Sequence, residues 1–231
     1  MARLVLVRHG QARATDLEHY DNLSEVGAAQ ARHLAEWYAD RGGLPHRVVV
    51  GPRRRHAQTW SAMRSVLADR GVTVPEPHYE DDFDEHDGIA MFRASLPALA
   101  GRPESAALAA GAARGRPRDV FAAFRYAMGL WAAGEVASPG PEQWGAFRRR
   151  AARVLSAYTA PERGDTLAIT SGGFISAVVG ELLQLSDERL LSLMWSPYNG
   201  SWTEVVFTEH YTALERFNVT SHLPDDLLTK V

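Results

Sequence analysis

The stretch LVLVRHGQA, residues 4–12, indicates how the chain folds. Its apolar residues 4–7 form a short continuous run that stops at the polar turn 8–11. An apolar run of this length, bounded by a turn, is typical of a buried parallel strand rather than of a helix. We therefore expect a central strand here, with a polar turn at its carboxyl end.

Strand and helix patterns alternate on both sides of a central break in the sequence. Such alternation favours a parallel sheet with right-handed crossovers, and 231 residues suit a single domain. We predict an α/β three-layer sandwich with a mostly parallel central sheet and a helical cap insertion, residues 1–231 forming one domain. The expected elements are a helix with N-cap Ser24, strands at 47–50 and 72–74, a helix at 58–70, a strand at 166–170, helices at 174–185 and 187–193, and strands at 202–207 and 213–217.

The break spans residues 89–158, which are rich in Ala, Gly, Pro and Arg and contain no strand pattern. We expect this segment to be the helical cap, lying over one end of the sheet. Helical spacing occurs at 120–130 and 142–158, whereas 101–118 has the composition of a mobile connection. Because the cap would overhang the ligand end of the sheet, we expect it to determine substrate choice.

The composition excludes several classes of protein. The chain has no cysteine, which removes disulfide scaffolds, thiolate nucleophiles and thiolate metal sites. Its formal net charge of −3 argues against a nucleic-acid partner. No apolar run approaches the ~20 residues of a membrane span, and the N-terminus becomes charged too soon for a signal peptide. We expect a cytoplasmic protein without a membrane or nucleic-acid partner, with a homodimer as the commonest default assembly.

Polar clusters follow three of the predicted strands, at residues 8–11, 51–59 and 171–173. A fourth, acidic cluster occupies residues 80–87. In open parallel sheets the carboxyl ends of the strands meet at one edge, where ligands bind. Guanidinium groups fork onto phosphate oxygens, and amides at a helix N-terminus add a positive potential. The clusters therefore predict a phosphate-handling site.

These motifs resemble the histidine phosphatase superfamily, the phosphoglycerate-mutase-like proteins. VLVRHGQA at 5–12 is similar to the family signature, RHAQT at 55–59 to its second arginine and Gln-Thr helix start, and Phe83-Asp84-Glu85 to the segment with the general acid. The resemblance covers nearly the whole chain and is weakest between residues 89 and 136.

This resemblance implies a metal-independent phosphomonoester hydrolase, a histidine-type acid phosphatase that works through a phosphohistidine on His9. It implies no cofactor and a small phosphorylated substrate, with phosphate or sulfate expected in the pocket. Arg8 and Arg55 would hold the phosphoryl oxygens, and Glu85 would protonate the leaving oxygen and then activate water. Asp82 and Asp84 remain alternatives to Glu85. The expected catalytic residues are Arg8, His9, Arg55, Glu85 and Ser171, and the expected phosphate-binding residues are Arg8, His9, Gly10, Gln11, Arg55, Ser171 and Gly172.

Ser171 is the main departure, because the family pattern has a second catalytic histidine at this position. A serine can donate a neutral hydrogen bond but supplies no positive charge. Neutral bonds contribute roughly 0.5–1.5 kcal/mol against roughly 1.5–3 for charged ones, so the exchange predicts a loss of about tenfold or more in rate. We accordingly expect Ser171→His to raise turnover. His56 and His86 flank the site, and either could partly replace the missing imidazole.

Other functions remain open at the level of sequence. One alternative is a catalytically weakened module that binds a phosphate ligand or has a regulatory role. Another is phosphoryl transfer of the phosphoglycerate-mutase type, which ranks below hydrolysis because the extra segments of the glycolytic mutase are missing. Metal-dependent hydrolysis is disfavoured, since only the acidic cluster at residues 81–84 supports it.

Overall fold

A six-stranded sheet in the order β3-β2-β4-β1-β5-β6 forms the centre of the protein. In the computed structural model, residues 1–13, 21–136 and 142–230 are described. Strands β1 to β4 run parallel to one another, whereas β5 is antiparallel to β1 and β6 is antiparallel to β5. The strands are β1 Ala2–Arg8, β2 Arg47–Val50, β3 His78–Tyr79, β4 Thr166–Thr170, β5 Trp202–Phe207 and β6 Thr212–Val219.

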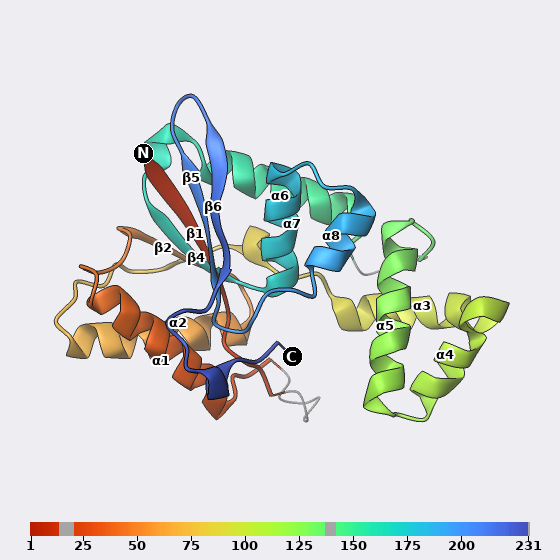
Figure 1. The fold of residues 1–231 in the computed structure, drawn as a ribbon. Coiled ribbons are helices and arrows are strands. Elements are labelled where there is room, and N and C mark those ends of the chain that lie inside the picture. The colour runs from red at the N-terminus through yellow and green to blue at the C-terminus, as the bar shows by residue number, and fades with distance from the viewer. Residues whose placement is uncertain (14–20, 137–141, 231) are drawn as a thin grey trace.

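Helices cover both faces of the sheet (Figure 1). On one face lie α1 (Glu25–Ala39) and α2 (Arg54–Asp69), and on the other lie α6 (Trp144–Tyr158) and α7 (Gly172–Leu182), with α8 (Asp187–Leu193) beside α7. This arrangement confirms the α/β three-layer sandwich with a mostly parallel sheet. None of the helices in the described part of the chain has the length and apolar character needed to cross a bilayer.

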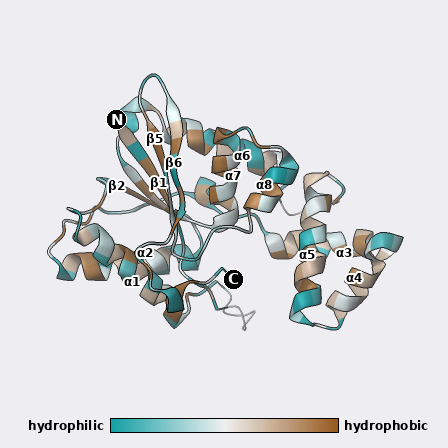
Figure 2. Cartoon of the chain, in the orientation of Figure 1, coloured by the Kyte–Doolittle hydropathy of each residue, from teal (hydrophilic) through white to brown (hydrophobic). Residues whose placement is uncertain are grey.

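The apolar run of β1 explains why the sheet is central. Leu4 and Leu6 face the core shared with α6 and α7, whereas Val5 and Val7 face the core shared with α1 and α2. All four side chains are buried, and Figure 2 shows hydrophobic colour along the strands between the helical layers. Burying each such side chain stabilises the fold by roughly 1.5–3 kcal/mol. The strand therefore needs apolar residues on both faces, as the sequence has.

The region from 72 to 79 differs from the sequence prediction. Residues 72–74 form no strand, and the short strand β3 lies at His78–Tyr79, paired with β2. Val72 and Val74 nevertheless pack against the core beneath α1 and α2. Their apolar character therefore reflects burial, and Pro75, which has no backbone N–H, does not favour strand pairing there. Helix α2 also begins earlier than expected, at Arg54 instead of residue 58.

Three helices, α3 (Gly88–Gly101), α4 (Pro103–Ala113) and α5 (Pro117–Ala132), stand to one side of the sandwich (Figure 1). The mobile connection predicted for 101–118 is wrong, because α4 occupies most of it. Proline at its first position and the alanines that follow favour a helix.

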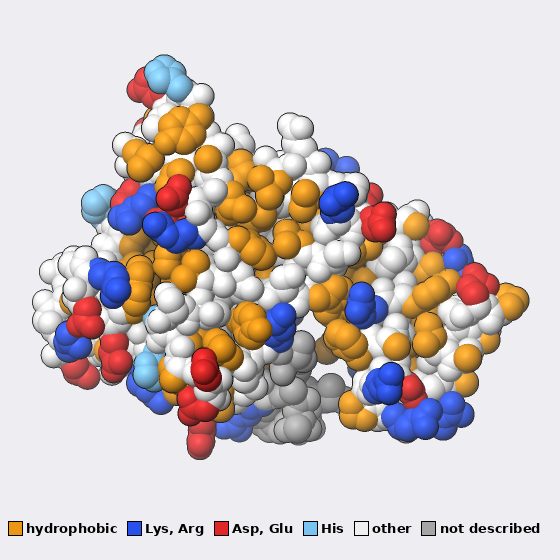
Figure 3. All heavy atoms as spheres, in the orientation of Figure 1, with side chains coloured by type: hydrophobic (Ala, Val, Ile, Leu, Met, Phe, Trp, Pro, Cys, Tyr) orange, Lys and Arg blue, Asp and Glu red, His pale blue; other side chains and the backbone are white. Residues whose placement is uncertain are grey.

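Of the stretch 89–158 expected as a cap, α3 to α5 form this lateral group, whereas α6 packs against α7 on the sheet. Met91, Met128 and Trp131 of the lateral helices belong to the same buried cluster as Leu4 and Phe174, which favours a single domain. Figure 3 shows basic side chains at the far tip of the group, where α4 turns into α5 and Arg114, Arg116 and Arg118 are exposed.

Candidate active site

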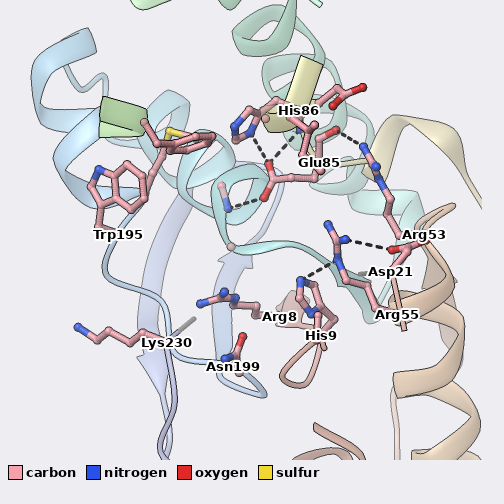
Figure 4. A pocket seen from close by; sticks show the side chains of 18 of the residues that line it. Arg8, His9, Asp21, Arg53, Arg55, Glu85, His86, Trp195, Asn199 and Lys230 are labelled. Carbon is pink, nitrogen blue, oxygen red and sulfur yellow. Dashed lines mark hydrogen bonds and ion pairs between the residues drawn. The ribbon is translucent and has the colours of Figure 1, made fainter. Parts of the chain in front are cut away.

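A cavity of about 320 Å³ opens at the carboxyl ends of the parallel strands. Figure 4 shows Arg8, His9 and Arg55 on one side of it and Glu85 with His86 across from them. These residues come from the end of β1, the first turn of α2 and the loop that follows β3. The structure thus brings together four of the residues predicted from distant parts of the sequence.

His9 follows β1 and is 6% exposed. Its Nδ1 lies 2.7 Å from the carbonyl oxygen of Gly10, so the Nδ1–H donates there, and its Nε2 accepts a hydrogen bond from Nε of Arg55 at 3.1 Å. Burial, and then the charges of Arg55 and Arg8, hold the pKa of His9 well below its usual 6.5. The ring is therefore neutral, with the Nε2 lone pair directed to the guanidinium side of the cavity.

Two guanidinium groups flank this ring. Arg55 is buried, and besides His9 its side chain contacts Asp21, whose Oδ1 accepts from Nη1 at 3.0 Å. Arg8, the last residue of β1, donates to the carbonyl oxygen of Pro197. A Cβ at Gly172 would come within 3.1 Å of the Arg8 side chain, so glycine at the start of α7 permits this close approach.

Glu85 lies on the opposite side, after the 3₁₀ turn Asp81–Phe83. Its carboxylate accepts hydrogen bonds from the backbone N–H of Gly173 at 2.9 Å and from the backbone N–H and ring Nδ1–H of His86 at 3.0 and 2.9 Å. Burial alone would raise the pKa of Glu85, but the contacts with His86 and the charge of Arg55 outweigh it and lower the pKa to about 2. A Cβ at Gly173 would lie 2.6 Å from Glu85 Oε1, so a larger residue there would displace the carboxylate from its present position.

The carboxylates of Asp82 and Asp84, the two alternatives to Glu85, contact other groups and not the cavity. Asp84 pairs with Nε of Arg53 and accepts from the backbone N–H of Glu85 at 2.7 Å, whereas Asp82 faces Arg153 at the surface. Neither lines the cavity, and Glu85 does. The geometry therefore favours Glu85 among the three acidic candidates.

Ser171 lies away from the cavity wall, against a buried histidine. Its Oγ is 2.8 Å from Nε2 of His56, and both side chains are almost completely buried. Burial, and then the charge of Arg55, lower the pKa of His56 to about 3, so this ring is neutral. The ring centroids of His56 and His9 are 5.6 Å apart. An imidazole thus stands beside position 171, but it comes from α2, and its Nε2 lies in contact with the end of the Ser171 side chain.

Gly10 and Gln11 tie the end of β1 to α1 and α2. The N–H of Gly10 donates to Oγ1 of Thr59 at 3.1 Å, and the N–H of Gln11 donates to Oε1 of Gln30 at 2.8 Å. A Cβ at Gly10 would lie 2.2 Å from the carbonyl oxygen of Gly27. Since both amides are committed and neither residue lines the cavity, the proposed phosphate site leaves them out.

Several residues of the cavity wall were not predicted from sequence. Asn199 and Lys230 line it near Arg8, and apolar side chains from α5 and the segment after α8 complete it (Figure 4). The amide of Asn199 donates to Thr229 at 2.9 Å, which fixes the C-terminal segment beside the cavity. The sequence signal for Lys230 is only that it is the single lysine of the chain. Within the described ranges, no group of three or more His, Asp or Glu side chains is arranged to hold a metal ion.

The fold and the cavity define an α/β protein of the phosphoglycerate-mutase-like class. A family model described as the histidine phosphatase superfamily (branch 1) matches residues 4–95 and 102–220. The chain therefore belongs to the histidine phosphatase superfamily. A comparison with curated proteins gave no match.

Solved structures with this fold include several phosphatases. Phosphoserine phosphatase from Entamoeba histolytica, in complex with 3-phosphoglyceric acid, has a TM-score of 0.63 and 18% identity over 97% of this chain and 100% of that chain. Mycobacterial glucosyl-3-phosphoglycerate phosphatase has a TM-score of 0.62 and 20% identity over 96% and 100%. Alpha-ribazole phosphatase from Shigella flexneri has a TM-score of 0.60 and 19% identity over 94% and 96%. At these identities the likeness concerns the fold.

Proposed function

We propose that this protein is a phosphatase that hydrolyses small phosphomonoesters through a phosphohistidine on Nε2 of His9, without a metal ion. The observation that carries the proposal is the state of His9. Its Nδ1–H is fixed by the Gly10 carbonyl, its pKa is depressed, and its Nε2 lies 3.1 Å from a guanidinium nitrogen at the cavity. A neutral imidazole with a directed lone pair next to cations is suited to attack a phosphoryl group.

Arg8 and Arg55 supply the positive charge for the phosphate. Charge spreads over the three equatorial oxygens in the loose transition state of phosphoryl transfer, and positioned guanidinium groups stabilise it. Membership of the family and the phosphatases with the same fold support this choice of ligand.

In the first step, the N–H on Nε of Arg55 turns from Nε2 of His9 to a phosphate oxygen, and the freed Nε2 forms a bond to phosphorus while the bond to the ester oxygen breaks. The ester enters as its monoanion, and its proton passes by way of the Glu85 carboxylate to the leaving oxygen, which departs as a neutral alcohol. Because Glu85 is ionised in the free protein, with a pKa of about 2, it carries this proton only while substrate is bound.

In the second step, water replaces the histidine. The Glu85 carboxylate takes one proton from water, the oxygen attacks phosphorus, and the bond between phosphorus and Nε2 breaks. The proton then goes to the phosphate, which leaves as its monoanion, so His9 and Glu85 return to their starting states. His56 lies behind the cavity wall and packs against His9, and Ser171 in turn holds the ring of His56.

The test is turnover of 4-nitrophenyl phosphate in the presence of a chelator, by the wild type and by His9→Ala. We expect His9→Ala to lose at least about 10³-fold in kcat, as when a nucleophile is removed from other enzymes. His46→Ala is the matched control, because His46 is exposed and far from the cavity, and it should keep full activity. Equal rates for wild type and His9→Ala would refute the proposal.

A binding module without catalysis would give a different result. It would retain vanadate or phosphate in the cavity, lose that binding in Arg55→Ala, and release no phosphate from any ester. Acid-labile, base-stable label from a ³²P ester on the wild type, absent from His9→Ala, would identify the phosphohistidine.

A further inference from the structure

The cavity has a charged end and an apolar end. The charged end holds Arg8, His9 and Arg55. At the other end, five apolar side chains from α3, α5 and the segment after α8 line the cavity, and we name them the apolar wall: Ile89, Phe124, Met128, Met194 and Trp195.

The apolar wall begins directly beside Glu85. The position of a Cβ on Gly173 lies 2.6 Å from Glu85 Oε1 and 2.9 Å from Cε of Met194, so these two groups are neighbours. On the other side of Glu85, the ring of Phe124 lies over Gly88 next to His86, since a Cβ there would meet both within 3.3 Å. Under the proposed function Glu85 must reach the leaving oxygen. The carbon skeleton attached to that oxygen therefore extends along this wall.

Packing holds the wall in place. The ring of Trp195 meets the ring of Phe121 edge-on at 5.1 Å and that of Phe124 at 6.0 Å, and the guanidinium of Arg125 lies 5.7 Å from its centroid. Met128 is 2% exposed. Such a surface is formed before any ligand arrives, which lowers the entropic cost of binding.

The apolar end offers few partners for hydroxyl groups. Its carboxylate, Asp87, already accepts from the N–H of Ala90 at 2.9 Å and caps α3. Ring Nδ1 of His86 is bound to Glu85. The other ring nitrogen of His86, Nε2, is buried and has no hydrogen-bond partner among the described residues. A sugar or glycerol leaving group would therefore lose hydration there and regain few hydrogen bonds, whereas an apolar group would gain by burial.

We propose that the substrates are phosphomonoesters of apolar alcohols large enough to carry a ring or branched chain, with the phosphate on the arginines and the hydrocarbon on the apolar wall. This inference rests on the proposed function, because it places the leaving group by means of Glu85. It assigns the choice of substrate to α3 and α5 of the lateral helices and to the segment after α8.

The test compares three alkyl esters, 2-phenylethyl phosphate, ethyl phosphate and glycerol 1-phosphate, by release of inorganic phosphate. We expect kcat/KM for the phenylethyl ester to exceed that for the other two by about 30-fold or more, the effect of burying a phenyl-sized group. Phe124→Ala should reduce this ratio to below about fivefold.

Two further variants separate specificity from folding. Ile89→Asn changes a wall residue that is 43% exposed, so it should fold normally and still lower the ratio. Tyr126→Ala is the matched control, because Tyr126 belongs to the same helix as Phe124 but does not line the cavity and its hydroxyl faces Glu104, and it should leave the ratio within about twofold.

Equal kcat/KM for the phenylethyl and glycerol esters, with both rates lost in His9→Ala, would overturn the inference and leave the proposed function intact. If no ester is hydrolysed, the proposed function fails. Calorimetry with 2-phenylethylphosphonate and ethylphosphonate then tests by binding alone whether the apolar wall selects the hydrocarbon. Tighter binding of the phenylethyl compound, lost in Ile89→Asn, would support it, and equal binding would overturn it.

Discussion

The contact between His56 and Ser171 predicts that the protein accepts a histidine at position 171 only when the ring at position 56 is removed as well. The family pattern places histidine at 171, and here the ring of His56 fills the space beside that position, with Nε2 2.8 Å from Ser171 Oγ. We therefore expect Ser171→His alone to lower both stability and turnover, in contrast to the expectation from sequence. The double variant His56→Ala with Ser171→His should recover much of both losses.

The magnitudes follow from burial. His56 is completely buried, and Ser171 is 1% exposed. His56→Ala removes the packed ring and leaves the serine hydroxyl unpaired, which together should cost about 3 kcal/mol. Ser171→His adds a ring to a filled site and should cost roughly 1–3 kcal/mol. If the second ring occupies the space left by the first, the double variant should be more stable than the sum predicts by roughly 1–3 kcal/mol.

The assay is a double-mutant cycle by urea unfolding, with turnover of one ester measured on the same four proteins. Changes in the midpoint at constant slope report stability. Additivity of the two single changes within about 0.5 kcal/mol would refute the reasoning, since independent sites behave in that way. Higher turnover in Ser171→His alone would refute it as well.

Four other predictions follow from the site. Arg55→Lys should lower kcat by about 10²-fold, because the single ammonium of lysine cannot fork onto two phosphate oxygens, whereas Arg54→Lys, at an exposed position, should not change it. Arg150→Met should lower kcat by about tenfold with little change in KM, because Arg150 donates to the carbonyl oxygens of Asp82 and Asp84 and so positions the loop that carries Glu85. The control is Arg149→Met, at the exposed neighbouring position. A change in KM alone would contradict this role of Arg150. The free energy of unfolding, measured with urea, should fall as the pH decreases from 6.5 towards 3. In this range the unfolded chain binds a proton on His56, whereas the folded protein, in which His56 has a pKa of about 3, does not. His56→Gln should reduce the change of unfolding free energy with pH by up to about 1.4 kcal/mol per pH unit. The value of kcat/KM should be nearly constant from about pH 6 down to about 4, because His9 stays neutral, and it should fall above about pH 6, where the ester monoanion loses its proton. A decrease of kcat/KM as the pH falls through 6.5 would contradict the lowered pKa of His9.

Much of the sandwich was predictable because its strands are short apolar runs buried on both faces. The run at 4–7 and the strands at 47–50 and 166–170 carry that pattern plainly, and the structure confirms all three. The prediction at 72–74 was wrong because a half-buried loop and a strand can share the same apolar composition. Helix α4 was missed because glycine and proline around it indicate a turn, while the stabilising contacts, such as that of Ser105 Oγ with the carbonyl of Leu99, are tertiary.

The charged end of the site was predictable from local motifs, and the apolar end was not. Arg8 and His9 follow one strand and Arg55 opens the next helix, so their convergence follows from the sheet topology. The choice of Glu85 over Asp84 required the structure, because Asp84 pairs with Arg53 whereas Glu85 lines the cavity and accepts a hydrogen bond from Gly173. The residues of the apolar wall are spread between positions 89 and 195 of the chain. Helix and strand periodicity relates only residues within one element, so the sequence did not indicate that these side chains lie together.

The two ionisable groups of the site are held in complementary states. Burial and two arginines keep His9 neutral, and the contacts with His86 together with the charge of Arg55 keep Glu85 charged. A catalyst that starts with a neutral nucleophile and an ionised carboxylate has no proton of its own for the leaving group, so the proton must come from the substrate. An apolar alcohol is a poor leaving group without that proton, and the cavity places its hydrocarbon against the residues that flank Glu85. The need for a proton from the substrate and the apolar wall beside Glu85 therefore indicate the same substrate, a monoanionic ester of an apolar alcohol.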